Sequence, residues 1–260
     1  MGLLDTMKQV AQATNDAGMP TAFLFGSVTK TSPLTIRVDN RFDISGDAIV
    51  VMAKLLSALP VGSVVKSTNT KYNGKVIRWI VGTQDTANGR TGLVTEKMIT
   101  LKCFDAKEPS NPNGNRQSYG NNRYSQSNID QWLNSADAAW YSARHSYDAP
   151  PNNSNVWSSY NEYDAEAGFL TNFEADFRNA ILDAVIRVVK NTVTDGGGYE
   201  DITRKVFLLS NTEVGLSNEN GVAEGTLWSY FSSAARRQCY PTAEAVSNSE
   251  YTSSSLNASS

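Results

Sequence analysis

The fold of this chain is decided around the stretch Tyr72-Asn-Gly-Lys-Val-Ile-Arg-Trp-Ile-Val81. Its Asn-Gly pair favours a type I′ hairpin turn, because both central residues of that turn need a positive φ. A strand over Lys75–Val81 follows the turn, and another over Gly62–Lys66 precedes it. Further strand structure is expected at Gly92–Thr95 and Met98–Lys102. The sequence therefore predicts antiparallel strands arranged around one hairpin.

Two helices are expected after these strands, each from a signal at its start. Ser127 precedes Asn128–Leu133 as an N-cap, and Thr171-Asn-Phe-Glu174 is a capping box. Behind that box, apolar residues recur every four positions, as on the core-facing side of one helix. These residues are Phe173, Phe177, Ile181 and Val185, with Leu182 beside them. Helices combined with antiparallel strands indicate the α+β class.

The rest of this region has weaker patterns. A strand is expected over 185–193, a glycine-rich turn over 194–199, a short apolar strand over 206–209 and a helix over 223–237. Residues 107–122 are rich in Asn, Gly, Ser and Pro without periodicity. They are expected to form a surface loop or a disordered one.

A small antiparallel meander is expected within residues 1–55. Leu34, Ile36 and Val38 alternate with polar residues, which is the period-2 pattern of a half-buried strand. The turn Thr31-Ser-Pro33 precedes that strand, and a third apolar stretch lies at Ala48–Met52. Three short strands cannot close a barrel, so the meander is expected to present open edges.

The apolar face of this meander needs a cover. The candidates are a partner protein's sheet edge, further copies of the chain, the second domain, or an amphipathic helix over residues 1–11 folded back as a lid. The residues of this face, which are the predicted partner-docking residues, are Phe23, Phe25, Leu34, Ile36, Val38, Ile49 and Val51.

Composition argues against several classes of protein. The 260 residues carry a net charge of −3 and no Lys/Arg cluster, so nucleic-acid binding is not expected. No apolar run approaches the roughly 20 residues of a membrane span, so membrane insertion is not expected. The first ten residues lack the pattern of a signal peptide, and synthesis is therefore expected in a host cytoplasm.

Few residues could support catalysis or metal binding. Cys103 and Cys239 could form one disulfide, but two buried free thiols are the favoured interpretation, and neither cysteine has CxxC spacing. His145 is the sole histidine, so a Cys/His metal site or catalytic pair is not expected. Carboxylates at 162–166 and at 200–201 suggest a glycosidase pair, and those at 195–201 a calcium loop, but loop carboxylates are ordinarily solvated. We therefore expect no enzyme, no metal and no cofactor.

An aromatic and polar segment over 147–164 is the candidate ligand-binding loop. Rigid rings interleaved with Asn and Ser give contact area at low cost in conformational entropy. The predicted ligand-binding residues are Trp157, Tyr160 and Tyr163. The alternative is a long insertion whose rings pack against its own domain.

Four further segments carry a resemblance. They are Ile77-Arg-Trp-Ile80, Ser127-Asn-Ile-Asp-Gln-Trp-Leu-Asn134, Lys205–Val214 and Tyr240-Pro-Thr-Ala-Glu-Ala245. Together they resemble a bacterial and phage display module related to C-type lectin-like and formylglycine-generating-enzyme-like folds. The resemblance implies a lectin-like α+β domain over residues 60–260 that lacks the family's C-terminal Trp-rich segment. The active-site cysteines of formylglycine-generating enzymes are not matched, so the resemblance implies no oxidase activity.

A second resemblance covers residues 15–52. Phe25-Gly26, Ser32-Pro-Leu34 and Val38-Asp39 resemble the start of small phage and prophage tail-baseplate proteins, which look like OB-type barrels of the spike and hub. The resemblance implies that residues 1–55 form a partial OB-like meander that docks onto other tail or baseplate proteins.

Together the resemblances imply a phage or tailocin tail component, associated with the baseplate, spike or fibre of a virion. Its lectin-like domain would recognise a glycan or a protein on the host cell surface. A homo-oligomer such as a trimer would amplify weak binding through effective concentration. The alternative is a purely structural baseplate or spike protein with a decorative C-terminal domain, and a cell-wall-degrading enzyme is the least favoured interpretation.

Overall fold

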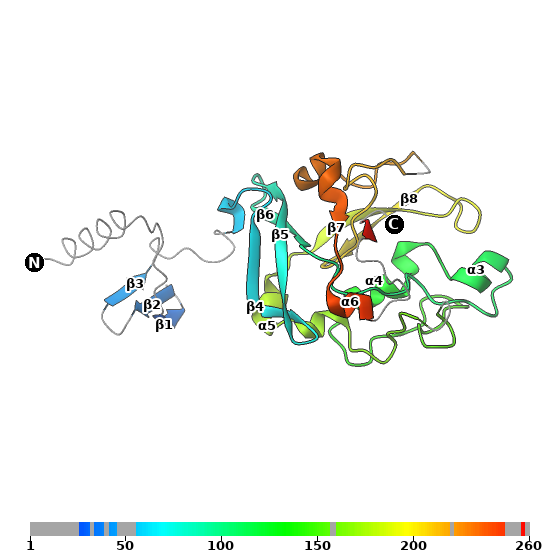
Figure 1. Cartoon of the computed structure of the whole chain (residues 1–260), viewed down its shortest axis with the longest axis horizontal. Helices are drawn as coiled ribbons and strands as arrows, with labels where there is room; N and C mark the ends of the chain where they lie inside the picture. The colour runs from blue at the N-terminus through cyan, green and yellow to red at the C-terminus, as the bar shows by residue number, and fades with distance from the viewer. Residues whose placement is uncertain are drawn as a thin grey trace, which may run out of the picture. The chain divides into compact units, whose positions relative to one another are not determined.

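The computed structural model of the 260-residue chain describes residues 26–31, 34–38, 42–45, 56–156, 160–218, 221–247 and 256–257. The chain divides into two compact units, Met1–Leu56 and Ser57–Ser260 (Figure 1). Short helices are mixed with small antiparallel sheets, so the protein is α+β, as the sequence predicts. Within the described ranges, no helix has the length and apolarity needed to cross a membrane.

The N-terminal unit contains a three-stranded antiparallel meander in the order β1-β2-β3. These strands are Gly26–Thr31, Leu34–Val38 and Phe42–Ser45. Thr31 pairs with Leu34, as the predicted turn requires, and Val38 pairs with Phe42. The third described strand therefore follows β2 closely, whereas the strand expected over 48–52 lies outside the described residues.

The predicted docking face is described only in part. Leu34, Ile36 and Val38 occupy alternate positions of β2, and the structure describes the backbone pairing of these three residues. The remaining members lie outside the described residues. They are Phe23, Phe25, Ile49 and Val51.

The second unit is built on the predicted hairpin. Its main sheet has the antiparallel order β4-β5-β6, formed by Val64–Tyr72, Lys75–Asp85 and Arg90–Thr95. The turn between β4 and β5 has Asn73 at φ 48° and Gly74 at φ 76°. Both values are positive, so the predicted type I′ geometry is confirmed. The strand expected at Met98–Lys102 is reduced to one bridge between Met98 and Pro241.

Two smaller sheets are also described in the second unit. β7 (Ala184–Val189) pairs with β8 (Tyr199–Arg204), and β9 (Gln238–Cys239) pairs with β10 (Leu256–Asn257). The strand expected over 206–209 is wrong. The Val206 backbone is bonded to the Asn134 side chain through both its N–H and its carbonyl, so these groups form no ladder.

Short α-helices and 3₁₀ turns connect the sheets in the described part of the second unit. The helices are α3 (Gly114–Tyr119), α4 (Asn128–Leu133), α5 (Ala175–Ala180) and α6 (Ala243–Ser247). The 3₁₀ turns are η2 (Tyr124–Gln126), η4 (Phe169–Asn172), η5 (Ser229–Ser232) and η6 (Ala234–Arg237). Ser127 accepts a hydrogen bond from the Asp130 amide at 3.3 Å, which confirms the predicted cap of α4.

The predicted capping box is wrong. Thr171 lies inside η4, and its hydroxyl donates to the Gly168 carbonyl at 2.7 Å instead of capping a helix. α5 begins only at Ala175 and ends at Ala180, so the predicted helical stripe is divided. Phe173 is buried, whereas Val185, the last residue of that stripe, lies on β7 and is 72% exposed.

The helix expected over 223–237 is also wrong. Gly225 has φ +98°, a left-handed conformation that interrupts a right-handed helix, and η5 and η6 follow separately. Trp228 instead lies on the main sheet. A Cβ atom at Gly82 would come within 2.5 Å of its ring, so glycine is needed at that position.

An aromatic core unites this unit. Trp132 of α4 lies 5.1 Å from Phe169 and 5.6 Å from Tyr163 between ring centroids. Tyr72 of β4 meets Trp132 edge to face at 6.3 Å. Such pairs contribute about 0.5–1.5 kcal/mol beyond the burial of their area. The core therefore fixes α4 against the main sheet.

Candidate recognition surface

Of the three predicted ligand-binding residues, the structure describes Tyr160 and Tyr163, and only Tyr160 is exposed. Trp157 lies outside the described residues, and Tyr160 is 47% exposed. Tyr163 is only 1% exposed: it stacks on Trp140 at 5.3 Å, and its hydroxyl donates to the Cys103 carbonyl at 3.0 Å. A ring enclosed in this way cannot contact a surface ligand, so the prediction for Tyr163 is wrong.

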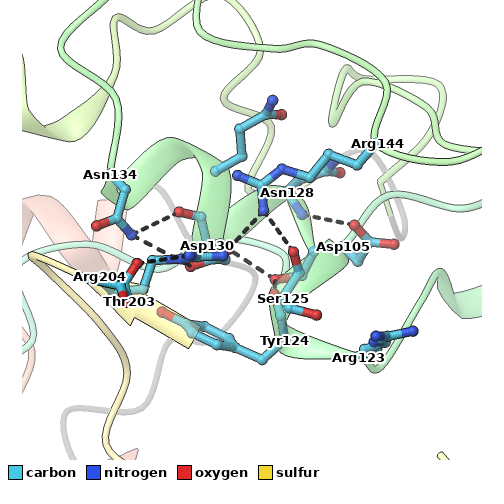
Figure 2. Close-up of polar contacts among 12 residues, drawn as sticks. Asp105, Arg123, Tyr124, Ser125, Asn128, Asp130, Asn134, Arg144, Thr203 and Arg204 are labelled. Carbon is cyan, nitrogen blue, oxygen red and sulfur yellow. Dashed lines mark hydrogen bonds and ion pairs between the residues drawn. The ribbon is translucent and has the colours of Figure 1, made fainter. Parts of the chain in front are cut away.

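A buried carboxylate, Asp130 of α4, instead organises the surroundings of the β7–β8 hairpin (Figure 2). Its side chain is fully buried and lies between two arginines. Arg204 donates to it through Nε at 2.6 Å and Nη2 at 2.7 Å, and Arg144 donates through Nη1 at 2.7 Å. These charge-assisted bonds offset the cost of burying the carboxylate.

Two further ion pairs attach the same hairpin to residues 116–125. Arg123 binds Glu200 of β8 at 2.7 and 2.6 Å, and Arg116 binds Asp195 at 3.0 and 2.8 Å. The bonds from Arg123 hold the pKa of Glu200 below its usual value. Together with the Arg204–Asp130 pair, they form what we call the ion-pair ladder. The ladder holds the hairpin at its turn, along β8 and at its base.

The opposite side of the hairpin faces solvent, and we call it the hairpin outer face. It consists of Val185 and Arg187 on β7 and Tyr199 and Asp201 on β8. Arg187 donates to Asp201 through Nε at 2.9 Å and Nη2 at 3.1 Å, and its guanidinium lies 3.8 Å from the Tyr199 ring centroid. Tyr199 is 49% exposed. This face therefore combines apolar surface with a charge pair fixed in one geometry.

An open cavity of about 400 Å³ adjoins this face. One side is lined by Val185, Ile186, Arg187 and Asp201, and the other by Glu213, Ala223, Gly225 and Thr226. Burial raises the pKa of Glu213. The volume lies within the roughly 300–1,000 Å³ of small-molecule sites. A second cavity, between β5 and α6, is smaller at about 150 Å³ and mostly apolar.

Several of the carboxylates that suggested calcium or glycosidase chemistry have structural partners. Asp195 and Glu200 belong to the ion-pair ladder, and Glu166 is bonded to Lys102 and to the Tyr72 hydroxyl. Among the described residues, no three His, Cys, Asp or Glu side chains are grouped so that they could hold a metal ion. These carboxylates therefore hold segments of the fold together.

The two cysteines are free, as the favoured interpretation predicts, but both are only partly buried. Burial raises the pKa of Cys103 to about 12 and also raises the pKa of Cys239. The nucleophile in cysteine chemistry is the thiolate, which these environments disfavour. The arrangement around them supports no nucleophilic role.

A second buried carboxylate, Asp105, lies beside the start of α4. Its oxygens accept hydrogen bonds from the Asn128 amide at 2.8 Å and the Asn121 amide at 2.6 Å. Burial raises its pKa to about 7, against the opposing effect of these two bonds, and the nearby Asp148 and Glu108 raise it further. Asp105 therefore fixes a loop junction and titrates near neutral pH.

The sequence of β8 carries a signal for the ion-pair ladder. Residues 199–204 read Tyr-Glu-Asp-Ile-Thr-Arg. In a strand, Glu200 and Arg204 lie on one face and Asp201 lies on the other, so charged residues occupy both faces. Charged residues facing inward require partners. Arg116 of α3 supplies one for Asp195, and Arg123, which precedes η2, supplies one for Glu200.

Comparison with known proteins identifies two family models. A protein of unknown function (DUF2577) is matched by residues 7–75, and a domain of unknown function (DUF6273) by residues 88–259. No curated protein and no solved structure matches the chain. Because residues 88–259 make up more than half of the chain, it belongs to the DUF6273 family.

Proposed function

We propose that this chain is a component of a phage or tailocin tail, associated with its baseplate, spike or fibre. Residues 1–55 dock it onto other tail proteins, and the DUF6273 domain is displayed to recognise the host cell surface. The proposal of host recognition is supported by the hairpin outer face. This face is exposed, while the ion-pair ladder holds the hairpin on its opposite side. A face ordered before binding loses less conformational entropy on binding.

The meander supports the docking half. Its three described strands form a sheet of their own within a separate compact unit. Its edges suit the addition of a strand from a partner protein. The family match to residues 7–75 is also distinct from the match to residues 88–259. The proposal includes assembly as a homo-oligomer, such as a trimer, in the tail of the virion.

A deletion tests docking. A chain lacking residues 1–56 should retain the cooperative melting transition of the second unit but should be missing from purified particles, as measured by quantitative mass spectrometry. The full-length chain expressed at the same level is the control. Normal incorporation of the deleted chain contradicts docking through residues 1–55.

A purely structural role is the second candidate. It is favoured by the burial of Tyr163, since part of the aromatic segment supports the core instead of facing a ligand. Particles carrying only residues 1–56 distinguish the two functions. Weaker adsorption of these particles to host cells supports recognition, and unchanged adsorption supports the structural role.

A further inference from the structure

We propose that the cavity beside the hairpin outer face is a binding site for a neutral saccharide. Both of its walls are held in place by hydrogen bonds. On the hairpin side, the Val189 amide donates to the Glu224 carboxylate at 3.0 Å, which ties β7 to the facing segment. Within that segment, the Glu224 amide donates to the Thr212 hydroxyl at 2.9 Å, and the Ser210 amide donates to Glu213 at 2.9 Å. The cavity is therefore a formed feature of the fold.

The lining offers hydrogen-bond donors and acceptors close together. Arg187 has five N–H groups and uses two of them on Asp201, which leaves three for other acceptors. Each Asp201 oxygen that accepts one of these bonds can accept another, and Thr226 contributes a hydroxyl to the facing wall. A hydroxyl group both donates and accepts. Adjacent hydroxyls of a sugar ring therefore match this alternation of donor and acceptor.

Charge and apolar surface narrow the class of ligand. Arg187 and Asp201 neutralise each other, and Glu213 is the one other ionisable residue of the lining, so the cavity offers no concentration of charge for a strongly ionic ligand. Val185, at 72% exposed, and the half-exposed Tyr199 ring supply apolar surface next to these polar groups. A sugar ring has polar hydroxyl edges and apolar C–H faces, which fits such a mixed surface. A neutral saccharide satisfies both requirements.

This inference rests on the proposed function in one respect: the proposed function identifies the saccharide as part of a glycan on the host surface. The binding site itself is argued from the cavity and its lining. Saccharide binding and tail incorporation can therefore succeed or fail separately.

Saturation-transfer NMR on the full-length chain tests the site. The probes are glucose, galactose, mannose and N-acetylglucosamine, and the disaccharides cellobiose, maltose, lactose and chitobiose, each at about 10 mM, which detects weak binding. At least one probe should give a transfer signal. Arg187→Ala, which removes the donors, and Ala223→Leu, which narrows the cavity from the exposed facing wall, should each weaken its binding about tenfold or more.

The matched control is Arg78→Ala. Arg78 also pairs with a carboxylate, Glu96, on an exposed strand, and it does not line this cavity. The Arg78→Ala variant should bind the probe as tightly as the parent does. All three variants should have melting temperatures within a few degrees of that of the parent. A variant that unfolds is replaced by Thr226→Val, which removes one lining hydroxyl.

Three results overturn the inference. The first is no transfer signal from any neutral probe, and the second is equal binding by the parent and both cavity variants. The third is binding confined to the charged probes glucosamine and glucuronate, which are measured in parallel. If these results occur while the chain enters particles and supports adsorption, the saccharide site alone is wrong. Saccharide binding by a chain that never enters particles contradicts the proposed function instead.

Discussion

Asp105 makes the stability of the second unit depend on pH in a defined direction. Its pKa is about 7 in the folded protein and 3.8 as an ordinary aspartate. The folded state therefore binds the proton more tightly than the unfolded state. The contribution to stability is fully present below about pH 4 and is lost as the pH rises through about 7.

The magnitude follows from the two pKa values. The difference of about 3 pH units corresponds to about 4 kcal/mol in the free energy of unfolding, at about 1.4 kcal/mol per unit. Asp105→Asn removes the titrating group while keeping one acceptor for the Asn121 and Asn128 amides. The variant should lose this part of the pH dependence, although its stability at pH 4 should fall by about 1 kcal/mol for the missing acceptor.

Urea denaturation at intervals from pH 4 to pH 8 measures the effect, with the variant's profile subtracted from that of the parent. This subtraction removes the contributions of other groups, such as Glu213. Asp176→Asn, at an exposed position of α5, is the control and should leave the profile unchanged. Superimposable profiles for the parent and Asp105→Asn would refute the reasoning.

Three further predictions concern the buried polar and aromatic groups. Asp130→Ala should lower the free energy of unfolding by about 3–5 kcal/mol, because it leaves Arg144 and Arg204 without the carboxylate that neutralises them. Urea denaturation measures this change, and a loss below about 1 kcal/mol contradicts the structural role given to Asp130. Tyr163→Phe should cost only about 1 kcal/mol in a thermal melt, since the stack on Trp140 remains and one hydroxyl bond is lost. A disulfide exchange reagent should modify Cys103 slowly at pH 8 in the folded protein and rapidly in urea, because burial raises the pKa of the thiol. Rapid modification of Cys103 in the folded protein would contradict its burial.

Features that depend on neighbouring residues could be predicted from the sequence. The Asn73–Gly74 turn requires positive φ at two adjacent positions, and few residues other than these adopt it readily. The Ser127 cap is equally local, since its acceptor and its donor are three residues apart. The α+β class followed from such signals.

Features that depend on distant contacts could not be predicted in this way. The same aromatic and polar pattern suits a surface loop or a core segment, and Tyr163 is buried because Trp132 and Trp140 enclose it. The partners in the ion-pair ladder lie more than 70 positions apart. The capping box failed for a similar reason, because η4 places Thr171 within its own turn.

Adsorption to host cells tests the central claim most directly, namely that the hairpin outer face recognises the host surface. Particles carrying Arg187→Ala should contain the normal amount of the protein but adsorb at least about tenfold more weakly than particles carrying Arg78→Ala. Equal adsorption by the two kinds of particle, with equal protein content, would contradict the claim.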